Sequence, residues 1–172
     1  MQLDCGTCII RAWRCEDETQ LVAVANDEEV SRYMTDVFPH PYRREDARSW
    51  IHFNSGDGAT NFAIVTNDAI AGGIGYRRLS GENRFTAEWG YWLGRRYWGR
   101  GIGTSAARVF VEYIFEHSDL ERLQAHVSAP NVASMRVLEK CGHMREGTLR
   151  RAVYKAGIYY DLAVFGLTRD MR

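Results

Sequence analysis

The stretch RRYWGRGIGTSA, residues Arg95–Ala106, places glycines at three alternate positions among arginines and aromatic residues. The sequence before it is typical of a strand, and the sequence after it is typical of an amphipathic helix. Amides in the first turn of a helix lack intrahelical acceptors and lie at the positive end of the helix dipole, so they suit phosphate groups. Glycine lets such a backbone adopt unusual dihedral angles and approach a ligand closely. We therefore predict an anion-binding loop here, because an ordinary tight turn before a helix would need only one glycine.

Two common phosphate-binding motifs do not fit this loop. No Lys-Ser/Thr pair follows the glycines at the spacing of a P-loop. The order of a dinucleotide-binding GxGxxG motif is also absent, and the preceding strands are expected to form a meander rather than a βαβ unit. Positive charge is nevertheless concentrated at the loop, on Arg95, Arg96 and Arg100. The sequence therefore favours an anion site outside those two classes.

The composition fits a globular protein. The chain has 172 residues, of which 45% are hydrophobic and 26% charged, and we expect a single domain over residues 1–172. The 22 basic residues balance the 22 acidic ones, which argues against nucleic acid or a membrane surface as a partner. No apolar run approaches the roughly 18 residues that a membrane span needs, and the start lacks the features of a signal peptide. We therefore expect a cytoplasmic protein.

Cys5 and Cys8 form a CxxC motif, which can mark a zinc site or a redox pair. A structural zinc site ordinarily has four ligands, often as two such pairs, and the sequence has no second pair. We therefore expect no metal, and reduced thiols near a loosely ordered N-terminus.

The first half of the chain is expected to alternate between strands and helices. Pro39 and Pro41 cannot continue a helix, so they separate two helical stretches. Helices are expected at 16–33, with a break near 26–27, and at 43–54, and strands at 8–13, 61–66, 69–80 and 84–93. The strands should form an antiparallel meander.

The second half begins with an amphipathic helix, because apolar residues recur at helical spacing from Ile102 and charged residues fall on the opposite face. Residues 122–128 alternate between apolar and polar, as in a half-buried strand. Asn131 opens a short helix that Gly142 ends. Residues 143–150 and 159–167 should form a closing strand pair around a turn at 156–157. Together these patterns predict a mixed α/β (α+β) fold with a mostly antiparallel sheet flanked by helices.

The segment Arg96-x-x-Gly99-x-Gly101 resembles the Q/R-x-x-G-x-G/A signature of the GNAT superfamily of acetyl-CoA-dependent N-acetyltransferases. Three longer segments resemble the RimJ/RimL-type branch, which acetylates the N-termini of ribosomal proteins: AEWGYWLGRRYWGRGIGTSA, NVASMRVLEKCGH and REGTLRRAVYKAGIYYDLAVFGL. The similarity spans most of the chain and is strongest over residues 87–167. It implies that the loop amides hold the pyrophosphate of coenzyme A.

The resemblance also implies acetyl-CoA as cosubstrate and places residues around it. The strand that ends at Trp92 and Leu93 should splay from the strand at 123–128, so that the pantetheine arm enters between them. Asn131 and Ser134 match an N-x-x-S motif that faces the coenzyme, although Asn131 alone could simply cap its helix. The coenzyme-binding residues implied in this way are Trp92, Leu93, Arg96, Trp98, Gly99, Arg100, Gly101, Ile102, Gly103, Thr104, Asn131 and Ser134.

The implied chemistry is direct attack of an amine on the thioester. Glu88 is the first candidate for the general base, because several members of the superfamily place a glutamate on this strand, but it could equally be a solvated or ion-paired strand residue. His126 is the second candidate, since a neutral imidazole suits proton transfer near pH 7, although it could also be a bystander. Many relatives use a tyrosine of an L-Y-E-K stretch as the general acid, and this chain has Val137-Leu138-Glu139-Lys140 there. The resemblance to the Rim-type branch instead implies Ser134 as the acid, although its hydroxyl could simply form a hydrogen bond to the backbone in the first turn of its helix.

The acceptor is expected to be the α-amine of a peptide or protein. An α-amine with a pKa of about 7.7–8.0 is roughly one-third neutral near pH 7.5, whereas only about one lysine amine in a thousand is. A small-molecule amine such as an antibiotic or polyamine stays open as acceptor, and so does a non-catalytic protein that only binds coenzyme A. Residues 36–46 should form the substrate wall, with His40, Tyr42 and Arg43 near the acceptor. The resemblance also implies a homodimer.

Overall fold

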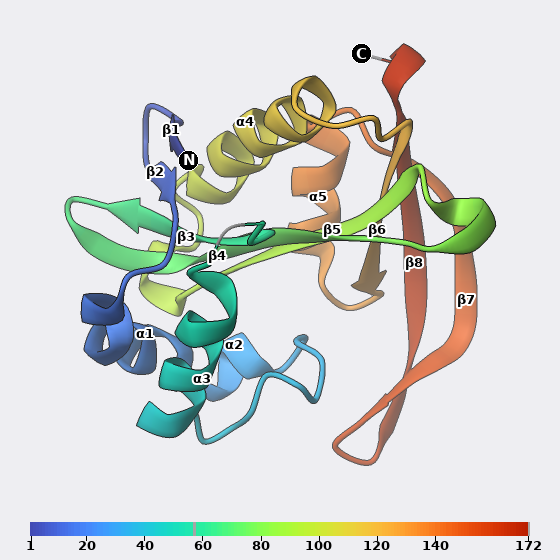
Figure 1. Cartoon of the computed structure of the whole chain (residues 1–172). Coiled ribbons are helices and arrows are strands. Elements are labelled where there is room, and N and C mark those ends of the chain that lie inside the picture. The colour runs from blue at the N-terminus through green and yellow to red at the C-terminus, as the bar shows by residue number, and fades with distance from the viewer. Residues whose placement is uncertain (57, 172) are drawn as a thin grey trace. The chain divides into compact units, whose positions relative to one another are not determined.

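The computed structural model describes residues 1–56 and 58–171 (Figure 1). Its eight-stranded sheet has the order β1-β2-β3-β4-β5-β6-β8-β7 and is mostly antiparallel, and five α-helices accompany it in the described part of the chain. The predicted mixed α/β fold is therefore confirmed. The chain divides into two compact units, residues 1–75 with 91–109 and residues 76–90 with 110–172, and the expected single domain stays a prediction. Among the described helices, none is both long enough and apolar enough to span a membrane.

The first unit begins with a hairpin that the sequence did not predict. Strand β1 (Gln2–Asp4) pairs antiparallel with β2 (Ile9–Arg11). The Cys5 amide closes the turn by donating to the Cys8 carbonyl at 2.9 Å, so the expectation of a loosely ordered N-terminus is wrong. The meander continues as predicted through β3 (Asn61–Thr66) and β4 (Ala69–Arg78), which pair antiparallel.

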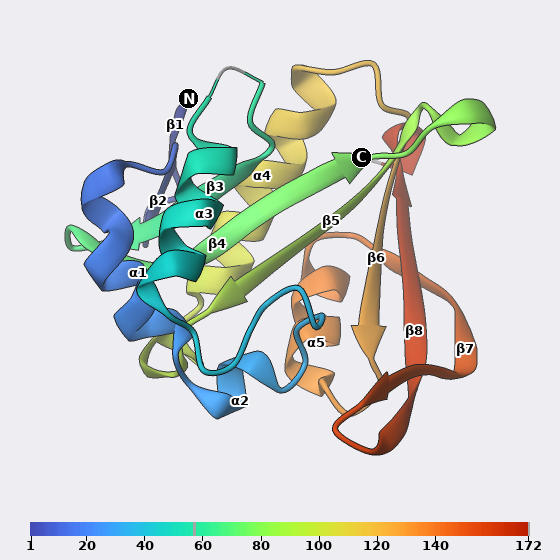
Figure 2. The same ribbon diagram turned by 60° about the horizontal axis from the view of Figure 1, so that its bottom comes forward.

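Three helices of the first unit fill the segment between β2 and β3. They are α1 (Glu18–Ala25), α2 (Glu28–Ser31) and α3 (Arg44–Asn54). The break between α1 and α2 lies where it was predicted, because the Asp27 carboxylate accepts a 2.9 Å hydrogen bond from the Glu29 amide and caps α2. Helices α1 and α3 lie side by side (Figure 2), and the Glu18 carboxylate joins them by accepting hydrogen bonds from Arg44 and Arg48.

In the second unit, the first part of strand β5 (Thr86–Leu93) belongs to the eight-stranded sheet. That part pairs parallel with β6 (Arg122–Ser128). Strand β6 then pairs antiparallel with β8 (Ile158–Thr168), and β8 pairs with β7 (Met144–Lys155) to form the long hairpin of Figure 1. Ala156 and Gly157 form its two-residue turn, both with positive φ, of 50° and 83°. This is the conformation that tight hairpins favour, so the predicted turn is confirmed.

Helix α4 (Ile102–Glu116) starts in the first unit and ends in the second, and α5 (Val132–Lys140) belongs to the second. The predicted amphipathic pattern of α4 is confirmed, because Arg108, Glu112 and Glu116 are exposed, whereas Phe110 and Ile114 are buried. The alternation along β6 is confirmed in the same way. The largest fully buried side chains are Ile10, Leu21, Ile64 and Ile70 in the first unit, and Phe110, Ile114, Phe115, Leu120, Leu123 and Phe165 in the second.

Candidate active site

The glycine loop lies between the end of β5 and the start of α4, in the first unit. Gly99 and Gly101 have φ values of +71° and +78°, in the left-handed region that disfavours every residue with a Cβ atom. A Cβ built on either glycine would meet no atom within 4 Å, so the space beside them is open. Gly103 is required for a different reason, because its Cβ would lie 3.0 Å from Cε2 of Tyr91. Two glycines therefore shape the loop, and the third lets α4 pack against the end of β5.

The start of α4 supplies hydrogen-bond donors beside this open space. The Ser105 amide donates to the Gly101 carbonyl at 3.0 Å. The amides of Ile102 and Gly103 come before it, in the first turn, where an α-helix offers no acceptor. These are donors that a phosphate group can use. The loop therefore combines open space with free amide donors, as a phosphate-binding loop requires.

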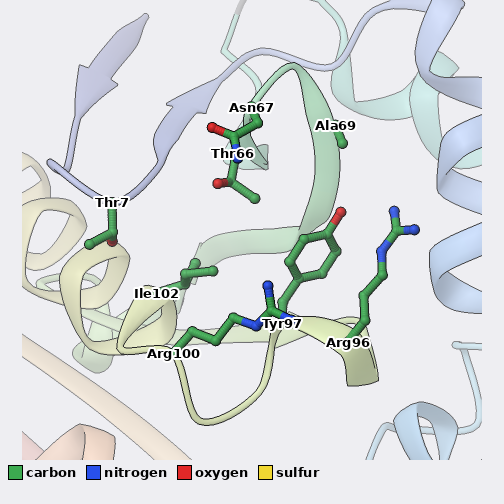
Figure 3. A pocket seen from close by; sticks show the side chains of 8 residues that line it. All are labelled: Thr7, Thr66, Asn67, Ala69, Arg96, Tyr97, Arg100 and Ile102. Atoms are coloured by element: carbon green, nitrogen blue, oxygen red, sulfur yellow. The ribbon is translucent and has the colours of Figure 1, made fainter.

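An open hollow of about 480 Å³ lies beside the loop in the first unit. Figure 3 shows the side chains that line it: Thr7, Thr66, Asn67, Ala69, Arg96, Tyr97, Arg100 and Ile102. The Arg96 guanidinium lies 4.8 Å from the centroid of the Tyr97 ring, so it stacks on an aromatic face as arginine often does. Two guanidinium groups with hydroxyl and amide side chains suit an anion. Thr7, which lies in the β1–β2 turn, was not predicted to be near the loop.

The end of β5 approaches β4 very closely. A Cβ atom on Gly72 would overlap the carbonyl oxygen of Trp92, and the Gly94 amide donates to the Ala71 carbonyl at 2.8 Å. The indole Nε1 of Trp98 donates to the Leu93 carbonyl at 2.7 Å. Trp98 therefore ties the loop to the strand end, and one acceptor position of Leu93 is already in use within the protein.

Phe38 lies against Trp92 and belongs to the segment at 36–46, for which a place in the substrate wall stays a prediction. The Phe38 ring meets the Trp92 ring edge-on at 5.2 Å between centroids, and it lies 5.0 Å from the Tyr42 ring. Tyr42 itself is only 5% exposed, and burial, assisted by the Asp46 charge, raises the pKa of its hydroxyl to about 12. Tyr42 is therefore an interior residue rather than an acceptor contact, which corrects that expectation. Phe38, which the sequence reasoning missed, is the half-buried aromatic residue at this position.

The two predicted bases contact each other in the second unit. Glu88 lies opposite Gln124 in the parallel β5–β6 ladder, and His126 lies two residues further along the same face of β6. Oε1 of Glu88 lies 2.8 Å from Nδ1 of His126. The other carboxylate oxygen, Oε2, accepts a 2.9 Å hydrogen bond from Nη2 of Arg77. Glu88 and His126 are both half-buried, with side chains 32% and 25% exposed.

The start of α5 carries the predicted N-x-x-S motif. The Asn131 side chain accepts a 3.2 Å hydrogen bond from the Ser134 amide, so the helix-capping role of Asn131 is present. This bond occupies the side-chain oxygen of Asn131 and the backbone of Ser134. It does not involve the Ser134 hydroxyl, which is the group that proton transfer would use, and Ser134 is half-buried.

The sequence analysis also did not identify His143, which is a buried histidine. Nε2 of His143 accepts a 2.9 Å hydrogen bond from Nε1 of Trp89, and His143 is 3% exposed. Burial lowers the pKa of His143 to about 4. The imidazole is therefore neutral near pH 7, with its hydrogen on Nδ1, and it is part of the core of the second unit rather than of a proton-transfer site.

The thiols of Cys5 and Cys8 lie in the β1–β2 turn, and a hydrogen bond between them lowers the pKa of Cys8 and raises that of Cys5. All four cysteines are free. Within residues 1–56 and 58–171, no cluster of three or more His, Cys, Asp or Glu side chains could hold a metal ion.

Comparison with known proteins identifies the family of the chain. A family model described as an acetyltransferase (GNAT) domain matches residues 8–144. The chain therefore belongs to the GNAT family, as the sequence resemblance predicted, and it is an acetyl-CoA-dependent N-acetyltransferase.

Individual relatives resemble the chain over most of its length. An uncharacterized N-acetyltransferase, p20 of Bacillus licheniformis, is 30% identical over 164 residues, covering 93% of this chain and 92% of the relative. The ribosomal-protein-serine acetyltransferase of Escherichia coli is 29% identical over 112 residues, covering 65% of this chain and 62% of the relative. The structure of RimL, a ribosomal L7/L12 alpha-N-protein acetyltransferase in complex with coenzyme A, has a TM-score of 0.87 over 100% of both chains. At 19% identity, that likeness shows the same fold.

Proposed function

We propose that this protein transfers the acetyl group of acetyl-CoA to the N-terminal α-amine of a peptide or protein. The observation that carries the use of acetyl-CoA is the glycine loop. Gly99 and Gly101 adopt positive φ beside open space, directly before the 15-residue helix α4. A loop of this shape at a helix N-terminus suits a pyrophosphate group.

Acetyl-CoA supplies the acetyl group as an activated thioester. We assign its pyrophosphate to the backbone of residues 99–104, with Arg96 and Arg100 adding positive charge. Trp92 and Leu93 remain the proposed contacts of the pantetheine arm. Trp98 acts by fixing the Leu93 carbonyl, with which it forms a 2.7 Å hydrogen bond. Asn131 and Ser134 remain proposed contacts at the start of α5.

Proton transfer is assigned to residues of the second unit. The ammonium group of the acceptor must lose a proton before its nitrogen can attack, and the Glu88–His126 pair is the proposed base. The departing thiolate must gain a proton, and the Ser134 hydroxyl is the proposed acid. Stabilisation of the oxyanion needs a single well-placed amide donor, which we assign to the end of β5.

Two observations support an α-amine as acceptor. A relative that covers 65% of this chain carries the name ribosomal-protein-serine acetyltransferase, so a ribosomal protein is the first candidate substrate. An α-amine also loses its proton more readily than a lysine amine, by about two to three pKa units. The α-amine is therefore the easier acceptor for a base built from a carboxylate and an imidazole.

The test is thiol release from acetyl-CoA with a panel of acceptors. The panel contains short peptides with free N-termini, the same peptides with blocked N-termini, polyamines and amino sugars. We expect release with the free peptides and none with the blocked ones. Thiol release with the small amines alone would show that the acceptor is a small amine rather than a peptide. Tight coenzyme binding without release for any amine would leave a non-catalytic coenzyme-binding protein. The expected homodimer and cytoplasmic location stay predictions.

A further inference from the structure

Within the Glu88–His126 pair, we infer that Nε2 of His126 is the atom that takes the ammonium proton, and that Glu88 is a positioning residue. This inference rests on the proposed function, because it divides one step of that reaction between two residues. Sequence reasoning ranks the two residues in the opposite order, and the hydrogen bonds between their side chains reverse the ranking.

The carboxylate of Glu88 is engaged at both oxygens. Oε1 lies 2.8 Å from Nδ1 of His126, and Oε2 accepts from Arg77 at 2.9 Å. A carboxylate paired with a guanidinium group offers its other hydrogen-bonding neighbours only acceptor oxygens. The hydrogen between Glu88 and His126 therefore lies on Nδ1. Each oxygen that already accepts a hydrogen bond is a weaker proton acceptor than a free one, so Glu88 is poorly prepared to act as the base.

The same hydrogen bond prepares His126. When Nδ1 carries the hydrogen, Nε2 carries the lone pair that a base needs. In the antiparallel β6–β8 ladder, His126 lies beside Val164, so it has an aliphatic neighbour on one side and the carboxylate on the other. Once Nε2 takes a proton, the imidazolium lies next to the negative charge of Glu88, which stabilises it. A neighbouring carboxylate acts in this way when it orients a catalytic histidine.

Arg77 completes the arrangement by fixing the orientation of Glu88. Its side chain is 72% exposed, so the ion pair contributes little to folding stability. Its guanidinium nevertheless holds Oε2, which leaves Oε1 directed at the imidazole. Arg77 is therefore a second positioning residue, one step further from the reacting atoms.

One proton of the ammonium group moves to Nε2 of His126, and the freed nitrogen lone pair forms the new C–N bond with the acetyl carbon. The C–S bond breaks, and its electron pair leaves on sulfur. The second proton of the nitrogen passes to the Ser134 hydroxyl, which gives its own proton to the thiolate. The products are the amide, the free thiol and an imidazolium, which returns its proton to water.

The test compares variants at the two positions in the full-length protein, using the amine acceptor that wild type prefers. His126→Ala should lower kcat by about 100-fold to 10,000-fold, and added imidazole should restore activity in proportion to its free-base concentration. His126→Asn tests folding separately, because its amide nitrogen can keep a hydrogen bond to Glu88 but offers no basic atom, and it should be as inactive as His126→Ala. Glu88→Gln keeps an oxygen acceptor for Nδ1 and should lower kcat by about tenfold.

Matched controls come from exposed residues of the second unit. His117 stacks on Tyr113, and Glu112 lies on the exposed face of α4. His117→Ala and Glu112→Gln should leave kcat unchanged. Imidazole rescue separates a proton-transfer role from a structural role, because a folding defect at position 126 is not repaired by a soluble base.

Three results would overturn the assignment. If Glu88→Gln is as inactive as both His126 variants, and if imidazole rescues neither His126 variant while formate rescues Glu88→Ala, Glu88 is the base. If both His126 variants retain wild-type kcat, His126 takes no part in the reaction. In these two cases the proposed function survives, because wild type is active. If wild type acetylates no amine, the proposed function fails, and the inference fails with it.

Discussion

The indole Nε1 of Trp89 donates a 2.9 Å hydrogen bond to Nε2 of His143, in the interior of the second unit. Trp89 is 3% exposed, as is His143. Nδ1 of His143 is buried, and the backbone groups of Cys141 and Leu138 beside the imidazole offset only part of the cost of charging it. A buried imidazole is stable in its neutral form and resists protonation, because burial penalises the charged form. Acid should therefore destabilise the fold at the Trp89–His143 pair.

This sensitivity predicts how stability depends on pH. The folded-state pKa of His143 is lowered from 6.5 to about 4, so the unfolded chain binds the proton more readily. The contribution of His143 to stability is therefore complete above pH 6.5, declines as pH falls toward 4, and is lost below that. The full loss is about 3 kcal/mol. Urea denaturation at several pH values should show a steeper decline for wild type than for His143→Gln.

The control for that measurement is His117→Gln, because His117 is exposed. This variant should keep the wild-type pH dependence. Equal slopes between pH 4 and 6.5 for wild type and His143→Gln would show that His143 is not the titrating group.

Gly101→Val tests the coenzyme-binding loop. Valine at a φ of +78° is strained, and its side chain would fill the open space beside the loop. Coenzyme A binding, measured by calorimetry, should fall by at least tenfold. Gly81→Val is the matched control, because Gly81 also has a positive φ, of +63°, and open space around it. The control should lose a similar stability, about 1–3 kcal/mol, but keep its affinity. Unchanged affinity in a folded Gly101→Val protein would remove the loop from the site.

Gly72→Ala tests the close approach of β4 to the end of β5. The added methyl group would overlap the Trp92 carbonyl oxygen, so the strand end must shift. We expect a loss of about 1–3 kcal/mol in the free energy of unfolding, together with a raised KM for acetyl-CoA. Gly90→Ala is the control, because a Cβ at Gly90 in the same strand β5 meets nothing within 4 Å. Equal stability and KM for the two variants would argue against a role for this contact.

Ser134→Ala tests the general acid. A coenzyme A thiol should resemble a cysteine thiol with a pKa of about 8.5, which leaves fairly well without protonation. We therefore expect kcat to fall by only about tenfold to 100-fold, with little change in the KM for acetyl-CoA. Ser80→Ala, at an exposed position before β5, should leave both constants unchanged. A wild-type kcat for Ser134→Ala would exclude Ser134 as the acid.

The sequence predicted elements whose cause is local. Helix α4 followed from the spacing of its apolar residues, and the turn at Ala156 and Gly157 followed from the strand patterns on either side. Strand β1 was missed because three residues, Gln2–Asp4, are too few to show an alternation. Strand β1 pairs with β2 across a hairpin turn that contains Cys5 and Cys8. Their CxxC motif was considered as a zinc site or a redox pair rather than as a turn.

The candidate site was predicted one residue at a time, but the relations between the residues were not. Glu88 and His126 were both candidates, yet their contact depends on the lateral register of two parallel strands, which neither strand's pattern records. The pairing of Trp89 with His143 joins strand β5 to the turn between α5 and β7, and no local sequence pattern records it either. Gly72 carried a usable signal, because glycine inside a strand often marks the close approach of another backbone. The partner, Trp92, became evident only in the structure.

Transfer to an α-amine is tested most directly with one peptide that carries both a free N-terminus and an internal lysine. The peptide is incubated with the protein and acetyl-CoA, and tandem mass spectrometry locates the acetyl group. The proposed function predicts one acetyl group on the N-terminal nitrogen and none on a second peptide whose N-terminus is blocked. An acetyl group on the lysine, or an unmodified peptide under conditions in which a polyamine or amino sugar is acetylated, would contradict it.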